Sequence, residues 1–315
     1  LHTLFELYRK LKKMKTINMT IDEAFEKSKH DIIGDNLIIT SLTEAEELYD
    51  KFIQLRQKLS IVGLQIIDVM PHYRGEQKFG WDIRPGIFRP PLNITDPKIG
   101  KQLEKKAIHE FEKTITEKVG QKVLRDIFNK EKHGKDWDLL FQAQHAGVKT
   151  TLTDWTPNIV SAMYFATEQS TDDLIEKSDG QLWSFIIPTD NILGHNDYPV
   201  RNTFYDIDPF DVKSTFLINP SSYLDDIDKR IFEYRMYRQK GRFIMPSNDT
   251  CHIPLNQQDE LKKFIFQARI PAEHKAKIRE ELAKRGVDRN STYIDENPQR
   301  QDLITEINST IFKGY

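Results

Sequence analysis

Hydrophobic positions at helical spacing alternate along the chain with shorter strand-like stretches. Ser41–Glu44 reads SLTE, a typical helix start, and helical spacing follows it directly. A second long amphipathic stretch covers residues 100–132, with a break expected at Gly120. The other predicted helices cover residues 136–146, 222–238 and 271–285, with one or two short helices in 1–30.

The strand-like stretches lie mostly in the middle and second half of the chain. They are the segment holding MPHYRG (70–75), VKTTLTDW (148–155), GQLWSFIIP (180–188), a strand before residue 222, RFIMP (242–246) and KFIFQARI (263–270). Thr156, Pro157 and Asn158 predict the start of the helix after the second strand, with Thr156 as its N-cap. The pattern predicts the α+β class, a central mixed sheet flanked by helices. We expect a helical extension over 1–44 and one domain over 45–315.

Composition narrows the class of protein further. A net charge of -2 over 315 residues gives no overall attraction for nucleic acids or anionic membranes, so any anion site must be local. The longest apolar run, Ile61–Ile67, is too short to span a bilayer. A single cysteine, Cys251, excludes an internal disulfide, and no secretion signal is evident, so a cytoplasmic protein is expected. A basic stripe (Arg9, Lys10, Lys12, Lys13, Lys15) is read as a solvated helix face, with a membrane or partner contact as the alternative.

Five polar side chains interrupt the otherwise hydrophobic stretch 141–166, and they are Gln144, His145, Thr151, Asp154 and Thr156. Buried polar groups need partners, so this layout indicates either the wall of a binding site or a self-satisfied polar core. His145 ends a helix just before Gly147, where it can cap carbonyls. Because the chain turns back at Gly147, we expect His145, Asp154 and Thr151 to line one pocket.

Arg74 stands beside Gly75, a pairing that suits a bidentate grip on a phosphate; the alternative is an ion pair with a carboxylate such as Asp154. Arg84 and Arg89 either extend this anion site or lie exposed beside a Pro-Gly turn. No metal site is expected, since the histidines are scattered. The acidic groups Asp206/Asp208 and Asp225/Asp226/Asp228 are read as solvated or capping, with a divalent-ion site as the alternative.

Three stretches, in order, resemble the FRG domain family, which is named for a Phe/Tyr-Arg-Gly motif. They are HYRGEQKFGWDIRPGIFR (72–89), AQHAGVKTTLTDWTPNIVSAMYFA (143–166) and RMYRQKGRF (235–243). The end of the chain, KIREELAKRGVDRNSTYID (277–295), is similar to the helix, glycine and strand that close that domain. Tyr73 in the name motif, Ala146 in place of an aromatic residue, and Thr151-Leu152-Thr153 in place of Arg-Leu-Leu are departures. The resemblance covers about residues 45–310.

A weaker resemblance links the order of these motifs to ADP-ribosyltransferases. It implies that Arg74 holds the pyrophosphate of NAD, that Thr151 and Thr153 support the nicotinamide pocket, and that Gln239 takes the place of an acid near the ribose. An amide cannot supply the charge that stabilises a ribosyl cation. The residues predicted to be catalytic are Arg74, His145, Asp154 and Gln239. The other residues predicted to bind the ligand are Tyr73, Gly75, Arg89, Gln144, Trp155, Thr156 and Arg235.

Two functions from different classes follow. The first is a nucleotide-handling effector, an ADP-ribosyltransferase-like or NAD-cleaving enzyme of a bacterial toxin or phage-defence system, with NAD as substrate, no metal, and a protein or nucleic acid as acceptor. The second is a non-catalytic module that recognises a nucleotide, a nucleic acid or a protein through the same pocket. The sequence leaves the oligomeric state open.

Overall fold

The computed structural model describes residues 21–61, 71–119, 134–186, 207–218, 239–293 and 298–315. Several predicted features lie outside these residues: the basic stripe, the break at Gly120, the helix over 222–238, Arg235, Asp206 and the acidic group at 225–228. The described helices are α2 (Ile21–Ile32), α3 (Leu42–Ile61), α4 (Pro97–Val119), α6 (Gly134–Ala146), α7 (Ile159–Thr167), α8 (Asp173–Glu176), α11 (Ala272–Lys284), α12 (Arg289–Thr292) and α13 (Pro298–Ile311). The strands are β1 (Leu37–Ile38), β2 (His72–Glu76), β3 (Thr153–Trp155), β4 (Gly180–Phe185), β5 (Phe216–Ile218), β6 (Arg242–Met245) and β7 (Ile265–Ile270), with short 3-10 helices η1 (Gly86–Phe88), η3 (Leu255–Gln257) and η4 (Lys262–Phe264).

The strands form two sheets. A four-stranded mixed sheet has the order β1-β7-β4-β2, in which β1 pairs with β7 in parallel and the other pairs are antiparallel. A three-stranded antiparallel sheet has the order β3-β6-β5. One bridge between Tyr73 and Thr156 joins β2 to the segment that follows β3. The predicted α+β class with a mixed sheet flanked by helices is therefore confirmed, with a second sheet added to it.

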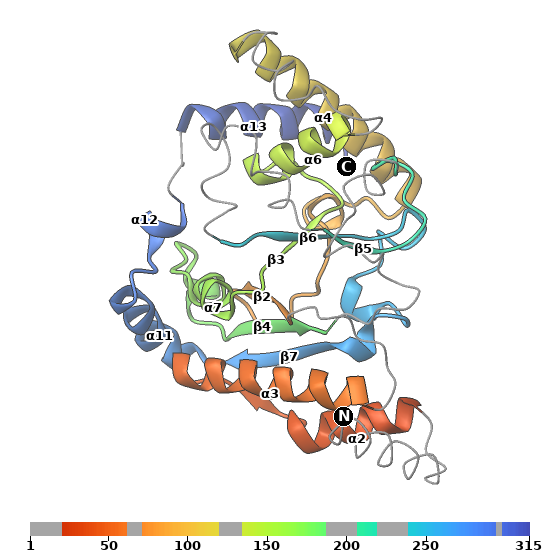
Figure 1. The fold of residues 1–315 in the computed structure, drawn as a ribbon. Coiled ribbons are helices and arrows are strands. Elements are labelled where there is room, and N and C mark those ends of the chain that lie inside the picture. Colours follow the sequence, from red (N-terminus) through yellow and green to blue (C-terminus); the bar gives the residue numbers. More distant parts are fainter. Residues whose placement is uncertain (1–20, 62–70, 120–133, 187–206, 219–238, 294–297) are drawn as a thin grey trace.

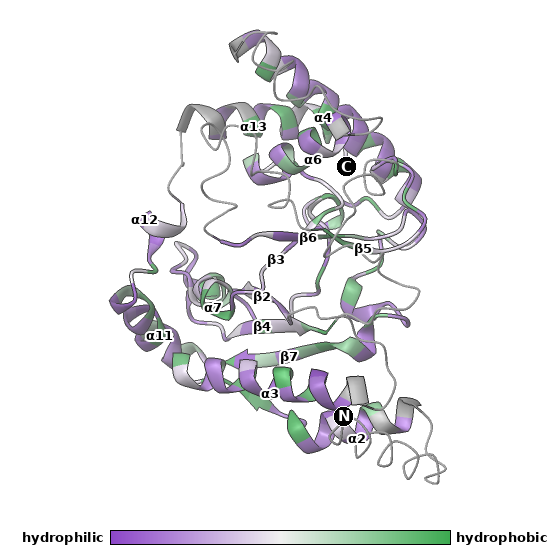
Figure 2. Cartoon of the chain, in the orientation of Figure 1, coloured by the Kyte–Doolittle hydropathy of each residue, from purple (hydrophilic) through white to green (hydrophobic). Residues whose placement is uncertain are grey.

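The molecule is layered, and the layers can be followed in Figure 1. Helices α2 and α3 cover the outer face of the four-stranded sheet, and α4, α6 and α13 lie beyond the three-stranded sheet. The described residues form two hydrophobic cores. The first contains Phe52 and Phe266 and also Trp155 of the three-stranded sheet, and the second contains Phe111, Trp137 and Phe243. Hydrophilic residues dominate the outer helices α4 and α11 (Figure 2), as burial of a single helix face requires.

Local sequence explains where several elements begin and end. Ser41 Oγ accepts the N–H of Glu44, so the SLTE start of α3 is confirmed. Gly147 has φ of 104° and ends α6, and the N–H of Val148 donates to the carbonyl of Ala143, a Schellman ending. The strand predicted at 148–155 is wrong in length, because it covers only Thr153–Trp155. The preceding N–H groups donate to side chains instead: Thr151 N to Glu104 and Leu152 N to Thr150.

Two further expectations are corrected. Thr156 is not the N-cap of α7; Asn158 is, and its side chain accepts the N–H of Val160. The strand expected near the end of the chain is helical over Arg289–Thr292, because Asp288 and Ser291 form a capping box that begins a turn of helix. The domain boundary at residue 44 stays a prediction. Phe25 and Ile39, before that boundary, share a core with Phe52.

Candidate functional site

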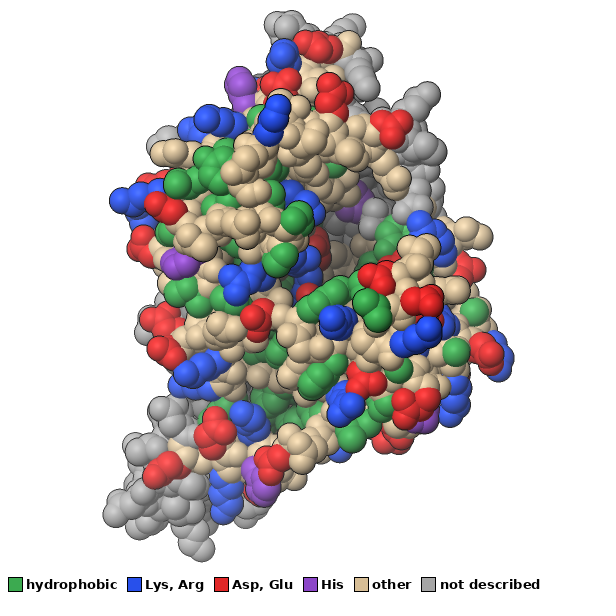
Figure 3. Space-filling model, turned by 180° about the vertical axis from the view of Figure 1, so that it is seen from behind, with side chains coloured by type: hydrophobic (Ala, Val, Ile, Leu, Met, Phe, Trp, Pro, Cys, Tyr) green, Lys and Arg blue, Asp and Glu red, His purple; other side chains and the backbone are tan. Residues whose placement is uncertain are grey.

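A cavity of about 420 Å³ lies between the two sheets, a size typical of small-molecule pockets. Strand β2 forms one wall, strands β3 and β6 form another, and α7 and the end of α6 complete it. In a view from behind, Figure 3 shows the surface hollowed near its middle, with basic and acidic side chains beside the hollow. Ten of the predicted site residues line this cavity: Tyr73, Arg74, Gly75, Arg89, Gln144, His145, Asp154, Trp155, Thr156 and Gln239.

Gly75 has a structural reason to be glycine that differs from a close approach to a ligand. A Cβ there would lie 1.8 Å from the carbonyl oxygen of Ala162 and 2.6 Å from the nitrogen of Ala166. Only glycine therefore lets α7 pack directly on β2. This close packing sets the position of α7 along one wall of the cavity, because Ala162 and Phe165 also line it.

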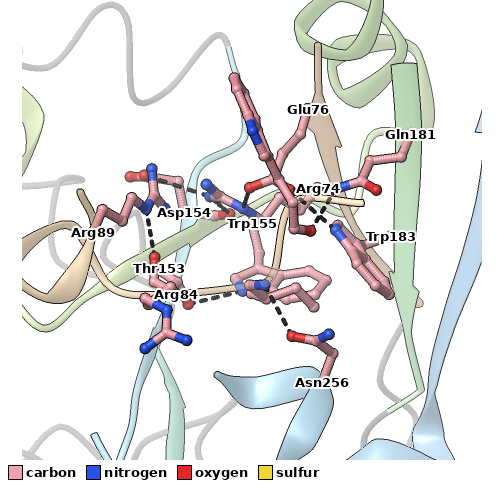
Figure 4. A network of polar contacts seen from close by, with 12 residues as sticks. Arg74, Glu76, Arg84, Arg89, Thr153, Asp154, Trp155, Gln181, Trp183 and Asn256 are labelled. Carbon is pink, nitrogen blue, oxygen red and sulfur yellow. Dashed lines mark hydrogen bonds and ion pairs between the residues drawn. The ribbon is translucent and has the colours of Figure 1, made fainter. Parts of the chain in front are cut away.

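Arg74 is held by groups of the protein on two sides. Its Nε donates to Glu76 Oε1 at 3.0 Å and its Nη1 donates to the carbonyl of Asp154 at 2.9 Å. The carboxylate of Asp154 lies farther away, at 3.8 Å. Glu76 is 7% exposed and also accepts Gln181 Nε2 at 2.7 Å and Trp183 Nε1 at 3.1 Å (Figure 4). The side chain of Arg74, which is 10% exposed, is thus fixed in orientation at the cavity wall.

Arg89 differs from Arg74 in its partners. Its Nε donates to the carbonyl of Arg84 at 2.5 Å, and among the described residues it makes no ion pair. Burial and, second to it, the charge of Arg74 lower its pKa to about 10, although Glu76 and Asp154 act in the opposite direction. The pKa of nearby Lys149 is lowered by burial and then by the charge of Arg89. Arg89 keeps its charge at neutral pH, because a pKa of about 10 lies well above 7, so this end of the cavity favours an anion.

Asp154 is exposed, and its two carboxylate oxygens accept Gln144 Nε2 at 3.1 and 3.0 Å. Gln144 in turn accepts the hydroxyl of Thr150 at 2.5 Å. The cap of α7 is Asn158 and not Asp154, and His145 and Asp154 line the same cavity. Thr156 donates to the carbonyl of Gln239 at 2.7 Å and accepts the N–H of Asn158 at 3.0 Å.

Thr151 and Thr153 lie away from the cavity lining. Thr151 belongs to a buried network: Glu104 Oε1 accepts its N–H at 2.5 Å and its hydroxyl at 2.8 Å, and Lys101 Nζ lies 2.8 Å from that hydroxyl. Lys101 and Glu104 form an ion pair at 2.8 Å with side chains 7% and 0% exposed. Thr153 is buried and accepts Trp155 Nε1 at 3.0 Å. The predicted pocket of His145, Asp154 and Thr151 thus contains the first two residues only.

The cavity also contains residues that the sequence did not single out, namely Glu76, Gln77, Trp81, Phe165, Glu168, Arg242 and Phe243. Glu168 follows α7 and accepts the hydroxyl of Tyr293 at 2.9 Å. Its carboxylate pairs with Arg289 at 3.5 Å and raises the pKa of Tyr164, second to burial. The segment that holds Arg289 and Tyr293 also binds Gln239, because Gln239 Nε2 donates to the carbonyl of Thr292 at 3.1 Å. The sequence offered one indication of Glu168 as a site residue, because it is the first acidic residue after the motif 143–166.

Among the described residues, neither a metal site nor a membrane-spanning helix is found. No group of three or more His, Cys, Asp or Glu side chains is arranged to hold a metal ion in this part of the chain. Within the same residues, no helix combines the length and the apolar character that crossing a membrane requires.

Comparison with known families supports the resemblance seen in the sequence. Residues 71–174 match the model of the FRG domain family. The match covers β2, β3 and α7, and with them most of the cavity wall. Neither the curated proteins nor the solved structures gave a match.

Proposed function

We propose that this cavity binds a nucleotide and that the protein is a nucleotide-handling effector, with NAD as the substrate. The observation that carries the proposal is Arg89, a guanidinium at the cavity wall with no ion pair among the described residues. A guanidinium is a good partner for a phosphate, because its planar fork matches two phosphate oxygens. Arg74 is already oriented beside it and adds to the positive potential.

Glu168 supports an enzymatic role in this proposal. The cavity holds a carboxylate in addition to the Gln239 amide, so the charge that Gln239 lacks is present in the same space. In NAD cleavage the bond between ribose C1′ and the nicotinamide nitrogen breaks, and its electron pair leaves with nicotinamide. Water or an acceptor nucleophile on a protein or a nucleic acid then bonds to C1′ and loses a proton. A carboxylate beside the developing ribosyl cation stabilises that step.

The test compares two arginines that lie five positions apart in sequence. Isothermal titration with NAD is run on the wild type, on Arg89→Ala and on Arg84→Ala, and nicotinamide release is followed by mass spectrometry. Arg84 donates to the carbonyl of His252 at 3.2 Å and does not line the cavity, so its variant serves as the matched control. We expect Arg89→Ala to weaken NAD binding by about tenfold or more and Arg84→Ala to leave it within about twofold. Equal binding by all three proteins would contradict the proposal.

A non-catalytic binding module is the second candidate, and one observation favours it. Glu168 already accepts Tyr293 and pairs with Arg289, so its charge is partly used by the protein. NAD binding without nicotinamide release would support this alternative.

A bacterial toxin or phage-defence effector is the cellular role that the enzymatic proposal predicts, and NAD in the cytoplasm would be its target. Expression of the wild type should then lower cellular NAD and arrest growth. Expression of Glu168→Gln should do neither, at equal protein level.

A further inference from the structure

Trp81 is placed differently from the other tryptophans of the chain. Of the four, Trp137, Trp155 and Trp183 are buried, whereas Trp81 is 40% exposed and lines the cavity. Within the described part of the chain, its indole contacts no other ring and its Nε1 has no hydrogen-bond partner. An exposed indole at the wall of a pocket leaves a large aromatic face in solvent without a partner.

The backbone around Trp81 is firmly held, although the side chain is not. Gln181 Nε2 donates to the carbonyl of Trp81 at 2.7 Å, and Gln181 Oε1 accepts the N–H of Gly80 at 2.8 Å. On the other side of Trp81, Asp82 accepts Asn256 and Gln257, each at 2.9 Å. The loop therefore presents the indole from a fixed position.

Gln181 also connects this loop to the polar end of the site. The same Nε2 that donates to Trp81 donates to Glu76 Oε2, and Glu76 orients Arg74 (Figure 4). The loop that carries the indole is thus tied, through Gln181 and Glu76, to the guanidinium of Arg74 at the cavity wall. A ligand that binds through a phosphate at Arg74 and Arg89 would have an aromatic surface available for a ring attached to it.

We propose that Trp81 is a stacking platform for a planar ring of the ligand, and hence that the ligand class is a phosphate-containing compound with an aromatic base. This inference rests on the proposed nucleotide site and adds the group that recognises the base. Stacking on an aromatic side chain tolerates different bases because each base has a π face. The ring can be the adenine or the nicotinamide of NAD, and the experiment separates the two.

Phe79 supplies a matched control. It lies in the same loop and is 41% exposed, but it does not line the cavity, and its ring lies under the guanidinium of Arg269 at 5.6 Å. Trp81→Ala, Trp81→Phe and Phe79→Ala are titrated with three probes. ADP-ribose carries adenine, nicotinamide mononucleotide carries nicotinamide, and inorganic pyrophosphate carries no ring. Thermal melting checks that each variant is folded.

We expect Trp81→Ala to weaken binding of at least one ring-bearing probe by about tenfold and to leave pyrophosphate unchanged. Trp81→Phe should retain most of the affinity, and Phe79→Ala should match the wild type. The affected probe identifies the stacked ring. That probe should also quench the emission of exposed tryptophan in the wild type and not in Trp81→Phe.

Two outcomes count against the inference, and they are distinguishable. If Trp81→Ala binds both ring-bearing probes as the wild type does, while Arg89→Ala does not, the stacking role is wrong and the nucleotide site stands. If the wild type binds none of the probes, both the site and the stacking role are wrong.

Discussion

Arg74 and Glu76 lie two residues apart on β2, and their side chains are joined on the same face of the strand by a hydrogen bond of 3.0 Å. Alternation along a strand puts positions i and i+2 on one face, so the motif Tyr-Arg-Gly-Glu carries its own orienting carboxylate. The sequence suggested Asp154 as the partner of Arg74. The structure shows that the backbone carbonyl of Asp154 is the closer group, at 2.9 Å.

We expect Glu76→Gln to lower the free energy of unfolding by about 3 kcal/mol, because a buried guanidinium loses its counter-charge. Binding of pyrophosphate should weaken as well, since Arg74 loses its orientation. Urea denaturation and calorimetric titration measure the two effects. Glu46→Gln is the control, because Glu46 pairs with Arg285 on the surface, where removal of the charge has little effect on stability. Unchanged stability of Glu76→Gln would show that the pair does not hold Arg74.

Gly75→Ala should be strongly destabilising, since the added Cβ would overlap the carbonyl oxygen of Ala162 in α7. We expect a loss of about 3 kcal/mol or more, at the upper end of overpacking effects. Gly86→Ala is the matched control, because its Cβ would meet no atom closer than 3.7 Å. Thermal melting of the two variants measures the difference. Equal melting temperatures would contradict the close packing of α7 on β2.

The sequence predicted part of the candidate site. The periodic patterns predicted most helices and strands. The motifs predicted much of the cavity lining, because Arg74 and Asp154 lie on β2 and β3 and His145 lies in the last turn of α6. Glu168, Trp81 and Arg242 were missed. They reach the cavity through long-range contacts, such as the bond between Gln77 and the carbonyl of Glu168, which no local pattern encodes.

Thr151 was predicted to line the pocket, but it does not line the cavity. A threonine within a polar and hydrophobic strand was expected at the pocket, but its partners Lys101 and Glu104 come from α4, about fifty positions earlier. The strand prediction failed there for the same reason, because the N–H of Thr151 donates to Glu104. Contacts between segments so distant in sequence cannot be read from the spacing of residues.

The buried pair Lys101–Glu104 gives a third prediction. Lys101→Met should lower the free energy of unfolding by about 3–5 kcal/mol, because Glu104 would keep a buried charge without its partner. Adding Glu104→Gln should recover part of this loss, since a neutral amide can still accept the N–H of Thr151. Urea denaturation of the single and double variants measures the coupling. Losses that simply add would argue against an interacting pair.

Cys251 allows a test of burial by pH and reactivity. Burial raises the pKa of its thiol to about 12, from an ordinary value of 9.0. A raised folded-state pKa contributes stability that is present below pH 9.0 and is lost as pH rises through about 12. Since Cys251 is the single cysteine, one reagent reports on it alone. At pH 8 the native thiol should react with a disulfide reagent far more slowly than in urea, and equal rates would contradict its burial.

The last prediction asks which side chain supplies the acid in the proposed reaction. Gln239 donates to the carbonyl of Thr292, so Gln239→Ala should lower the free energy of unfolding by about 1 kcal/mol and leave NAD affinity nearly unchanged. Glu168→Gln removes the negative charge but keeps an acceptor for Tyr293, so NAD should still bind while nicotinamide release falls by about tenfold or more. Gln239→Glu places a second carboxylate in the same cavity, and release should rise if the new charge reaches the ribose. All three variants are compared by mass spectrometry of nicotinamide under saturating NAD. Release by Glu168→Gln at the wild-type rate, with Gln239→Glu also unchanged, would remove both side chains as the acid and leave the non-catalytic binding module as the better account.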